Sequence, residues 1–418
     1  MNGPDESTID VVRKATRELA RKFDYAYWRQ KDKCGEYPWE FVKAFAQGGW
    51  LGALIPEQYG GLGLGIAECG VMMQEIAASG AGASGASAVH FYLFPPEPII
   101  RHGSAEMKQE FLPKLARGEI LMAFGVTEPT AGVDTSRIRT KADKVDGGWV
   151  VNGQKVWISN AQNAHKILLL ARTSARNEDK PLDGMTLFFT DLNRERITVR
   201  EIEKLGRSAI DSNELFIEDL EVSDDDVVGE VGRGFKYLIG GLNSERIVVG
   251  LEGVGIGQAA LELATVYAND RVVFDRPIGQ NQAVAHPLAD SWIRLESARL
   301  MAMHAAELYD DHQNCGIQAA AAKYLAPRPA SMPATAPCPP TVATPTPRNT
   351  TLSGCGGRHG CSATRPSRRR WCSTTSPPKR SSCPAPTDLG RGRCGCRRVP
   401  LRPGVLDLAQ WAPFGLPM

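Results

Sequence analysis

Cysteine is scarce in the first 326 residues of this 418-residue chain, where only Cys34, Cys69 and Cys315 occur. Three scattered cysteines do not make the disulfide framework of a secreted scaffold, so we expect a reducing compartment. No run of about eighteen apolar residues is evident, so we expect no membrane span. The first ten residues, MNGPDESTID, are polar and acidic and unlike a secretory signal peptide. These absences favour a cytoplasmic protein.

Acidic residues are nearly absent from the last part of the chain. Residues 327–418 hold 14 Lys and Arg against two acids, Asp388 and Asp407, together with 17 of the 28 prolines and seven of the ten cysteines. Residues 1–326 hold 45 acidic and 35 basic residues instead. So sharp a change indicates that the two parts have different origins. The first part is long enough for two or three domains with large buried cores.

Hydrophobic periodicity divides the first part into three regions. Residues 8–118 have the spacing of amphipathic helices, including a stretch from Trp39 to Ala46 opened by Pro38. From about residue 121 the spacing becomes that of strands, with buried-strand candidates at 167–170 and 185–189. Helical spacing returns from Tyr237 to about Leu325. The order is therefore helices, then a β domain, then helices, an α+β arrangement.

Two glycine-containing segments need separate interpretation. Asn152-Gly153 stands between two short strand-like runs, and this dipeptide supplies the positive φ angles of a tight hairpin turn, so we expect the turn there. Gly253-Val254-Gly255-Ile256-Gly257 imitates a dinucleotide-binding fingerprint. No strand precedes that segment and it lies in a helical stretch, so we interpret it as helix packing.

Several motifs occur in order along residues 10–326. They are Phe124-Gly125-Val126-Thr127-Glu128-Pro129, Trp157-Ile158-Ser159, Leu205-Gly206-Arg207, Gly229 with Gly232 and Gly234, and Arg271 to Ile278 followed by Gln282. This combination resembles the acyl-CoA dehydrogenase family. The resemblance implies an N-terminal helical domain (residues 1–120), a central β domain for flavin and substrate (121–232) and a C-terminal helical bundle. We expect only the first part of that bundle (233–326), followed by an out-of-frame, disordered tail (327–418).

The resemblance also assigns the binding of the cofactor FAD. It implies that Phe124, Val126 and Thr127 line the flavin ring, and that Trp157, Ile158 and Ser159 lie on its other side. An indole there would shield the ring from water. Without the family, Trp157 would be interpreted as a packed strand residue. Positions that grip the pyrophosphate end, commonly across a subunit interface in a homodimer or homotetramer, match Arg271, Phe274 and Gln282. We expect no metal site.

One carboxylate matches the catalytic base of the family. Leu242-Asn243-Ser244-Glu245-Arg246 fits the L-x-x-E-R pattern of the isovaleryl and long-chain enzymes. Glu245 precedes an apolar run, and Val249 at i+4 offers no salt bridge along the helix, which argues against a surface role. The resemblance places Asn243 and Arg246 at the CoA portion. Val133 stands where many relatives carry serine beside flavin and substrate, a departure that puts the hydrogen bond from this site in doubt.

The implied reaction is α,β-dehydrogenation of an acyl-CoA thioester, which belongs to fatty acid and lipid metabolism. Glu245 removes the α proton, the β hydride passes to FAD, and the electrons go on to an electron-transfer flavoprotein. An acyl-CoA oxidase that uses oxygen and an inactive CoA-binding pseudoenzyme are the alternatives. DNA or RNA binding through Arg368-Arg369-Arg370 is a further possibility, but the tail lacks an aromatic platform, so we expect no nucleic-acid partner.

A shifted reading frame explains these residues better than a disordered basic tail or a cysteine-rich metal module, since the cysteines form no C-x-x-C pairs. Read one base over, residues 341–351 and the preceding junction permit H-G-G-Y-A-Y-A-x-E-Y-H, which resembles the glycine motif that the family carries here. Residues 381–388 permit V-L-P-R-S-Y and a stop codon. The shifted frame also replaces the family's alternative base loop, Y-E-G-T, by A-P-V-S. We therefore expect a one-base slip near codon 327, with poor flavin retention and aggregation of the chain as written.

Overall fold

The computed structural model describes residues 7–326 of the chain. Its N-terminal third is helical, as the periodicity predicts. Side-chain caps set the starts of three of these helices: Ser7, Asp24 and Ser104 each accept a hydrogen bond from a backbone amide in the first turn of the helix that follows. The helices are α1 (Thr8–Ala20), α2 (Tyr25–Cys34), α3 (Trp39–Gln47), α4 (Ile66–Ile76), α5 (Gly82–Leu93), α6 (Glu97–His102) and α7 (Ala105–Ala116).

A seven-stranded mixed sheet follows. Its hydrogen-bonded order is β1-β4-β2-β3-β7-β6, and β5 pairs with β4 off this path. Both strands predicted from buried runs are confirmed as β4 and β5, which pair antiparallel. The strands are β1 (Met122–Gly125), β2 (Lys141–Val145), β3 (Gly148–Ser159), β4 (Lys166–Arg172), β5 (Met185–Asp191), β6 (Ile197–Glu201) and β7 (Ser212–Ser223).

The prediction of a turn at Asn152-Gly153 was wrong. Both residues lie inside the continuous strand β3, and the hairpin turn falls at Asp146-Gly147, between β2 and β3. Gly147 has φ +76° and supplies the left-handed conformation that the turn requires. Gly153 instead marks a register shift against β7, and a Cβ there would lie 2.4 Å from Oγ1 of Thr140. The dipeptide therefore serves a bulge and a close approach.

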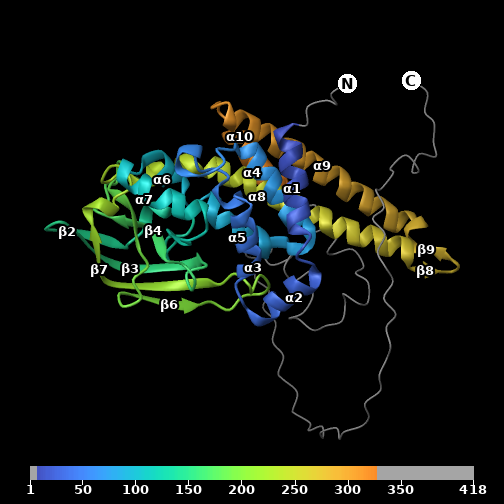
Figure 1. The fold of residues 1–418 in the computed structure, drawn as a ribbon, viewed down its shortest axis with the longest axis horizontal. Helices are drawn as coiled ribbons and strands as arrows, with labels where there is room; N and C mark the ends of the chain where they lie inside the picture. The colour runs from blue at the N-terminus through green and yellow to red at the C-terminus, as the bar shows by residue number, and fades with distance from the viewer. Residues whose placement is uncertain (1–6, 327–418) are drawn as a thin grey trace, which may run out of the picture. The chain divides into compact units, whose positions relative to one another are not determined.

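Two apolar layers cover opposite sides of strands β4 and β5. Alternate residues of β4 point to each side, so that Leu169 packs with Trp149 and Leu215 of the sheet interior. Leu168 and Leu170 pack instead in the cluster that contains Leu112 and Leu115 of α7. The rings of Phe111 and Phe189 meet edge to face at 5.1 Å in this layer. Helices α6 and α7 thus lie over one face of the sheet (Figure 1).

The C-terminal part consists of long helices. Helix α8 (Gly234–Asp270) and α9 (Gln282–Asp310) are joined by a short hairpin of β8 (Val272–Val273) and β9 (Arg276–Pro277), and α10 (Gly316–Leu325) ends the described chain. Figure 1 shows α8 and α9 side by side, with the β8–β9 hairpin at their far end from the sheet. The predicted shifted frame of residues 327–418 lies outside the described residues.

Helix α8 is a core helix. The face of α8 that carries Gly255 packs against α4, and a Cβ at Gly255 would lie 2.2 Å from the carbonyl oxygen of Gln74. The interpretation of residues 253–257 as helix packing is therefore confirmed. By length and composition alone, α8 is also the one helix within residues 7–326 that could cross a membrane. It was not predicted as such because polar residues interrupt its apolar stretch. Its most apolar stretch is 67% buried in the fold, as in core helices of water-soluble proteins.

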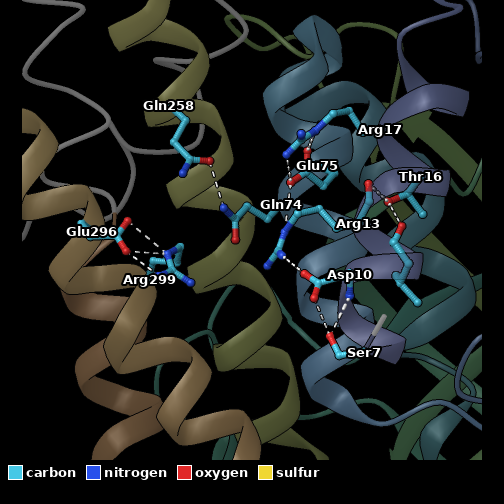
Figure 2. A network of polar contacts seen from close by, with 11 residues as sticks. Ser7, Asp10, Arg13, Thr16, Arg17, Gln74, Glu75, Gln258, Glu296 and Arg299 are labelled. Carbon is cyan, nitrogen blue, oxygen red and sulfur yellow. Dashed lines mark hydrogen bonds and ion pairs between the residues drawn. The ribbon is translucent and has the colours of Figure 1, made fainter. Parts of the chain in front are cut away.

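Polar contacts connect the first and last helical regions through α4. Figure 2 shows the guanidinium of Arg17 on α1 donating two hydrogen bonds, of 2.8 and 2.9 Å, to the carboxylate of Glu75. On the neighbouring position, Gln74 donates to Gln258 of α8 at 3.0 Å. A single hydrophobic cluster contains residues of α1–α5 and of α8–α10. The N-terminal and C-terminal helices consequently fold around a shared core.

Candidate active site

Glu245 lies near the start of α8, with 23% of its side chain exposed. The flanking Ser244 and Ile247 are buried, so Glu245 stands at the edge of the packed face of the helix. The Nζ of Lys323 on α10 is 3.8 Å from its Oε2, although Lys323 itself is half exposed. The absence of an i,i+4 salt bridge along α8 holds, but Lys323 of α10 is an ionic neighbour that the local pattern did not predict.

A buried polar network fixes the helix immediately before Glu245. Ser244 Oγ donates to Oε2 of Glu97 on α6 at 2.8 Å, and the Tyr309 hydroxyl of α9 donates to Oε1 at 2.6 Å. Arg101 Nε donates to the same carboxylate at 2.9 Å. Glu97 is 7% exposed, so its charge is held by three donors from three helices. This network sets the position of α8 and was not predicted from the sequence.

The residues predicted to contact CoA are adjacent on one face of α8. Arg246 donates a hydrogen bond of 2.8 Å from NH1 to Oδ1 of Asn243, and both side chains are half-buried. A guanidinium held in this way retains further donors for an anionic group such as a phosphate. The arrangement therefore brings a carboxylate, an amide and a guanidinium together within one turn of helix.

The two segments predicted to flank the flavin meet at the end of β1. The backbone N–H of Val156 on β3 donates to the carbonyl of Thr127 at 2.9 Å, directly after β1. Phe124, Val126 and Thr127 are half-buried. Trp157 follows with φ +63° and its indole 60% exposed, at a register shift between β3 and β7. An exposed indole beside half-buried apolar groups is a surface that a planar ring such as a flavin can cover.

The other two residues of the Trp157 segment differ in exposure. The Ile158 side chain is 1% exposed in the interior of the sheet, and its carbonyl accepts a hydrogen bond from Nδ2 of Asn213. Ser159 is half-buried, and NH2 of Arg207 donates to its hydroxyl at 3.4 Å. Because its side chain is buried and its carbonyl is engaged, Ile158 supports the segment from within the sheet.

Val133 follows Gly132, where a Cβ would lie 4.0 Å from the Thr127 side chain, whereas the pyrophosphate-binding candidates lie far from Glu245. Val133 is fully exposed on the loop after β1. Phe274 is 93% exposed at the β8–β9 turn, with Arg271 and Gln282 beside that hairpin. Residue 270 is separated from Glu245 by about 37 Å along α8, at about 1.5 Å per residue. One protomer does not bring these three residues to its own Glu245.

A buried ion pair supports the loop between β1 and β2. Lys155 of β3 is fully buried, and its Nζ is 2.9 Å from Oε1 of Glu128. Burial lowers the pKa of Lys155 to about 8, and the adjacent carboxylate opposes that shift. Burial raises the pKa of Glu128, but Lys155 and the hydrogen-bond donors around the carboxylate outweigh it and hold this pKa below its usual value. The buried pair was not predicted from the sequence, although Lys155 at an inward-facing position of a strand could have indicated it.

The described residues 7–326 contain no group of three or more histidine, cysteine or acidic side chains placed to hold a metal ion. The described side chains offer a partly exposed carboxylate, an amide and a guanidinium on α8, and separately an indole and hydroxyl groups after β1 and on β3. The fold defines a class of three-part protein, with a helical domain, a β domain and a second helical domain.

Comparison with known proteins specifies the class. Models of the acyl-CoA dehydrogenase N-terminal, middle and C-terminal domains match residues 7–119, 123–220 and 232–333. An acyl-CoA dehydrogenase of Bacillus subtilis (strain 168) is 35% identical over 317 residues, which are 76% of this chain and 83% of that protein. The mitochondrial isovaleryl-CoA dehydrogenase of Solanum tuberosum is 37% identical over 250 residues, 60% of each chain.

A solved structure agrees with the sequence comparisons. The complex of glutaryl-coenzyme A dehydrogenase with glutaryl-CoA superposes with a TM-score of 0.72 at 31% identity, covering 80% of this chain and 85% of that one. The chain belongs to the acyl-CoA dehydrogenase family, as the motifs predicted. The three-domain architecture of helical, β and helical parts is likewise that of the family.

Proposed function

We propose that this chain is an FAD-dependent acyl-CoA dehydrogenase that introduces an α,β double bond into an acyl-CoA thioester, and that Glu245 is its base. The match to all three domains of the family carries the proposal. The position of Glu245 supports it, because the carboxylate stands at the edge of a packed apolar helix face, with Asn243 and Arg246 within the same turn. Bound FAD supplies a hydride acceptor.

Residues of the chain remove the proton, orient the CoA portion and shape the flavin site. Glu245 Oε takes the α proton, and the apolar face around it limits the water that would compete for the proton. Arg246 and Asn243 orient the CoA portion through their spare donors. Phe124, Val126 and Thr127 on one side and Trp157 and Ser159 on the other shape the surface for the flavin ring. Ile158 supports that surface from the sheet interior, and Val133 borders the acyl group.

A charge-neutral substitution of the base tests the reaction. In the frame-restored chain, Glu245→Gln should abolish bleaching of the flavin's visible absorption by acyl-CoA under anaerobic conditions, a loss of about 100-fold or more in rate. Glu262→Gln, an exposed glutamate on the same helix, is the matched control and should keep the parental rate. Parental bleaching by the Glu245→Gln variant would eliminate Glu245 as the base. Slow reoxidation of the bleached flavin in air separates a dehydrogenase from an oxidase.

We further propose that the active unit contains more than one copy of the chain, a homodimer or homotetramer. The distance of about 37 Å between Glu245 and the β8–β9 hairpin supports this. Arg271, Phe274 and Gln282 would then complete the cofactor site of a neighbouring copy. An electron-transfer flavoprotein is the proposed acceptor, and a structure described as an electron transferring flavoprotein of Acidaminococcus fermentans resembles this chain at 28% identity. Fatty acid and lipid metabolism in the cytoplasm remains the predicted context.

A further inference from the structure

A lysine is buried completely inside the β domain, next to the surface proposed for the flavin. Lys155 is among the largest fully buried side chains of the described fold, and its partner Glu128 is 4% exposed. Burying both charges is costly, and apolar residues of similar volume often stabilise a fold equally well. Stability alone therefore does not account for an ion pair at this position.

The contacts of the pair join three separate pieces of backbone. Lys155 Nζ donates to the carbonyl of Val126 at 3.1 Å as well as to Glu128. The Glu128 carboxylate also accepts the backbone N–H of Arg139 at 2.6 Å and that of Thr140 at 3.0 Å. The lysine thus ties β3 to the segment after β1, and the glutamate ties that segment to the start of β2.

Two neighbouring residues of β3, Lys155 and Val156, link the two sides of the proposed flavin surface. Lys155 holds the carbonyl of Val126, and the N–H of Val156 holds the carbonyl of Thr127. Trp157 comes next, where the register against β7 shifts and the backbone enters the left-handed region. Such strain persists only where the surrounding contacts over-determine it. The position of the indole relative to Thr127 consequently depends on the Lys155 anchor.

We propose that Lys155 and Glu128 are positioning residues, which hold the Val126–Thr127 segment and Trp157 at the separation that the flavin ring requires. This inference rests on the proposed function. Neither residue touches the ring in this proposal; both act through the backbone that they anchor. A purely structural pair would be replaceable by neutral residues without loss of cofactor binding, and a positioning pair would not.

The test compares three variants made in the frame-restored chain, because the chain as written is expected to retain flavin poorly. Lys155→Met removes the anchor but leaves Glu128 buried and unpaired. The double variant Lys155→Met/Glu128→Gln removes both charges, which relieves that penalty while leaving the Val126 carbonyl without its anchor. Lys144→Met is the control. Lys144 lies on β2, is half exposed and pairs with Asp224. Each is titrated with FAD, and the visible circular dichroism of bound flavin and the thermal unfolding midpoint are recorded.

We expect the unfolding midpoint of the double variant to lie closer to that of the parent than the midpoint of Lys155→Met does. The double variant should nevertheless bind FAD about tenfold more weakly than the parent, with altered circular dichroism of the bound flavin. Hydrogen–deuterium exchange of the FAD-free proteins should be faster at residues 126–128 in both Lys155 variants and unchanged in Lys144→Met. Parental FAD affinity, parental circular dichroism or parental exchange in the double variant would overturn the positioning role.

The hydrogen–deuterium exchange measurement distinguishes failure of the proposed function from failure of the positioning role. If the frame-restored parent binds no FAD but the variants loosen residues 126–128, the proposed function fails and the flavin role of the anchor falls with it. If the parent binds FAD and the double variant binds it equally well, the proposed function stands and the positioning role is overturned. If Lys155→Met does not fold, the double variant alone decides.

Discussion

Asp310, at the end of α9, caps the start of α4 through Ile66. Its Oδ1 accepts the backbone N–H of Ile66 at 2.8 Å, and its Oδ2 accepts that of Ala67 at 2.9 Å. A carboxylate at a helix N-terminus satisfies free amide donors and opposes the positive end of the helix dipole. Residues 244 positions apart are therefore joined at one helix end. The N-terminal helices depend on the C-terminal ones for more than apolar packing.

Removing this cap should destabilise the protein measurably. Asp310→Ala leaves two amide donors of α4 without their acceptor, and loss of such a cap costs about 0.5–2 kcal/mol of unfolding free energy. Asp311→Ala, at the exposed neighbouring position, is the control and should change little. Urea unfolding followed by circular dichroism measures both. Equal stability of the two variants would show that α4 does not depend on Asp310.

Two glycines of α8 should respond oppositely to alanine. At Gly255 a Cβ would lie 2.2 Å from the Gln74 carbonyl, so Gly255→Ala forces α4 and α8 apart and should cost about 1–3 kcal/mol. At Gly240 nothing lies within 4 Å of a Cβ, so Gly240→Ala should stabilise the helix by about 0.5–1 kcal/mol. Thermal unfolding of the two variants checks the sign of each effect. A neutral Gly255→Ala would contradict close packing of the two helices.

Stability should fall in acid partly because of Glu128. Its pKa in the folded protein lies below its ordinary value of 4.5, since Lys155 and the hydrogen-bond donors around it outweigh burial. As the pH falls through this range, the unfolded chain binds more protons than the folded one, so the free energy of unfolding decreases. The contribution is fully present above about pH 4.5 and is lost below it. Glu128→Gln should therefore show a shallower acid dependence of its urea midpoint than the parent; an equal slope would contradict the assignment.

The tail gives a prediction about the gene. We expect resequencing of codons 320–400 to find one missing or extra base near codon 327. The C-terminal domain model of the family matches only to residue 333 of the 418. Apolar side chains such as Trp292, Leu300 and Ile317 are exposed on α9 and α10, where further bundle helices would cover them. Restoring the frame should turn an aggregating, flavin-poor chain into a yellow oligomer in size-exclusion chromatography. A soluble yellow oligomer from the chain as written would contradict this.

The site could be predicted only as far as local patterns reach. Glu245 was found because L-x-x-E-R stands before an apolar run, and that pattern is local. Lys323, which approaches Glu245 from α10, was missed because nothing in the residues around 245 encodes a helix about eighty positions later. Glu97 and Tyr309 were missed for the same reason. Contacts between distant segments depend on packing, which periodicity does not specify.

The amino-acid sequence by itself determined the order of helices, strands and helices, the buried strands β4 and β5, and the family, because each depends on short-range periodicity or on ordered motifs. Only the tertiary structure decided that Asn152-Gly153 is a bulge, because Thr140, just before β2, approaches Gly153 and Asp146-Gly147 already makes the turn. It also decided that Lys155 is an interior anchor. A buried charge is stable only where distant groups supply its partners, and the fold alone brings Glu128 and the Val126 carbonyl to it.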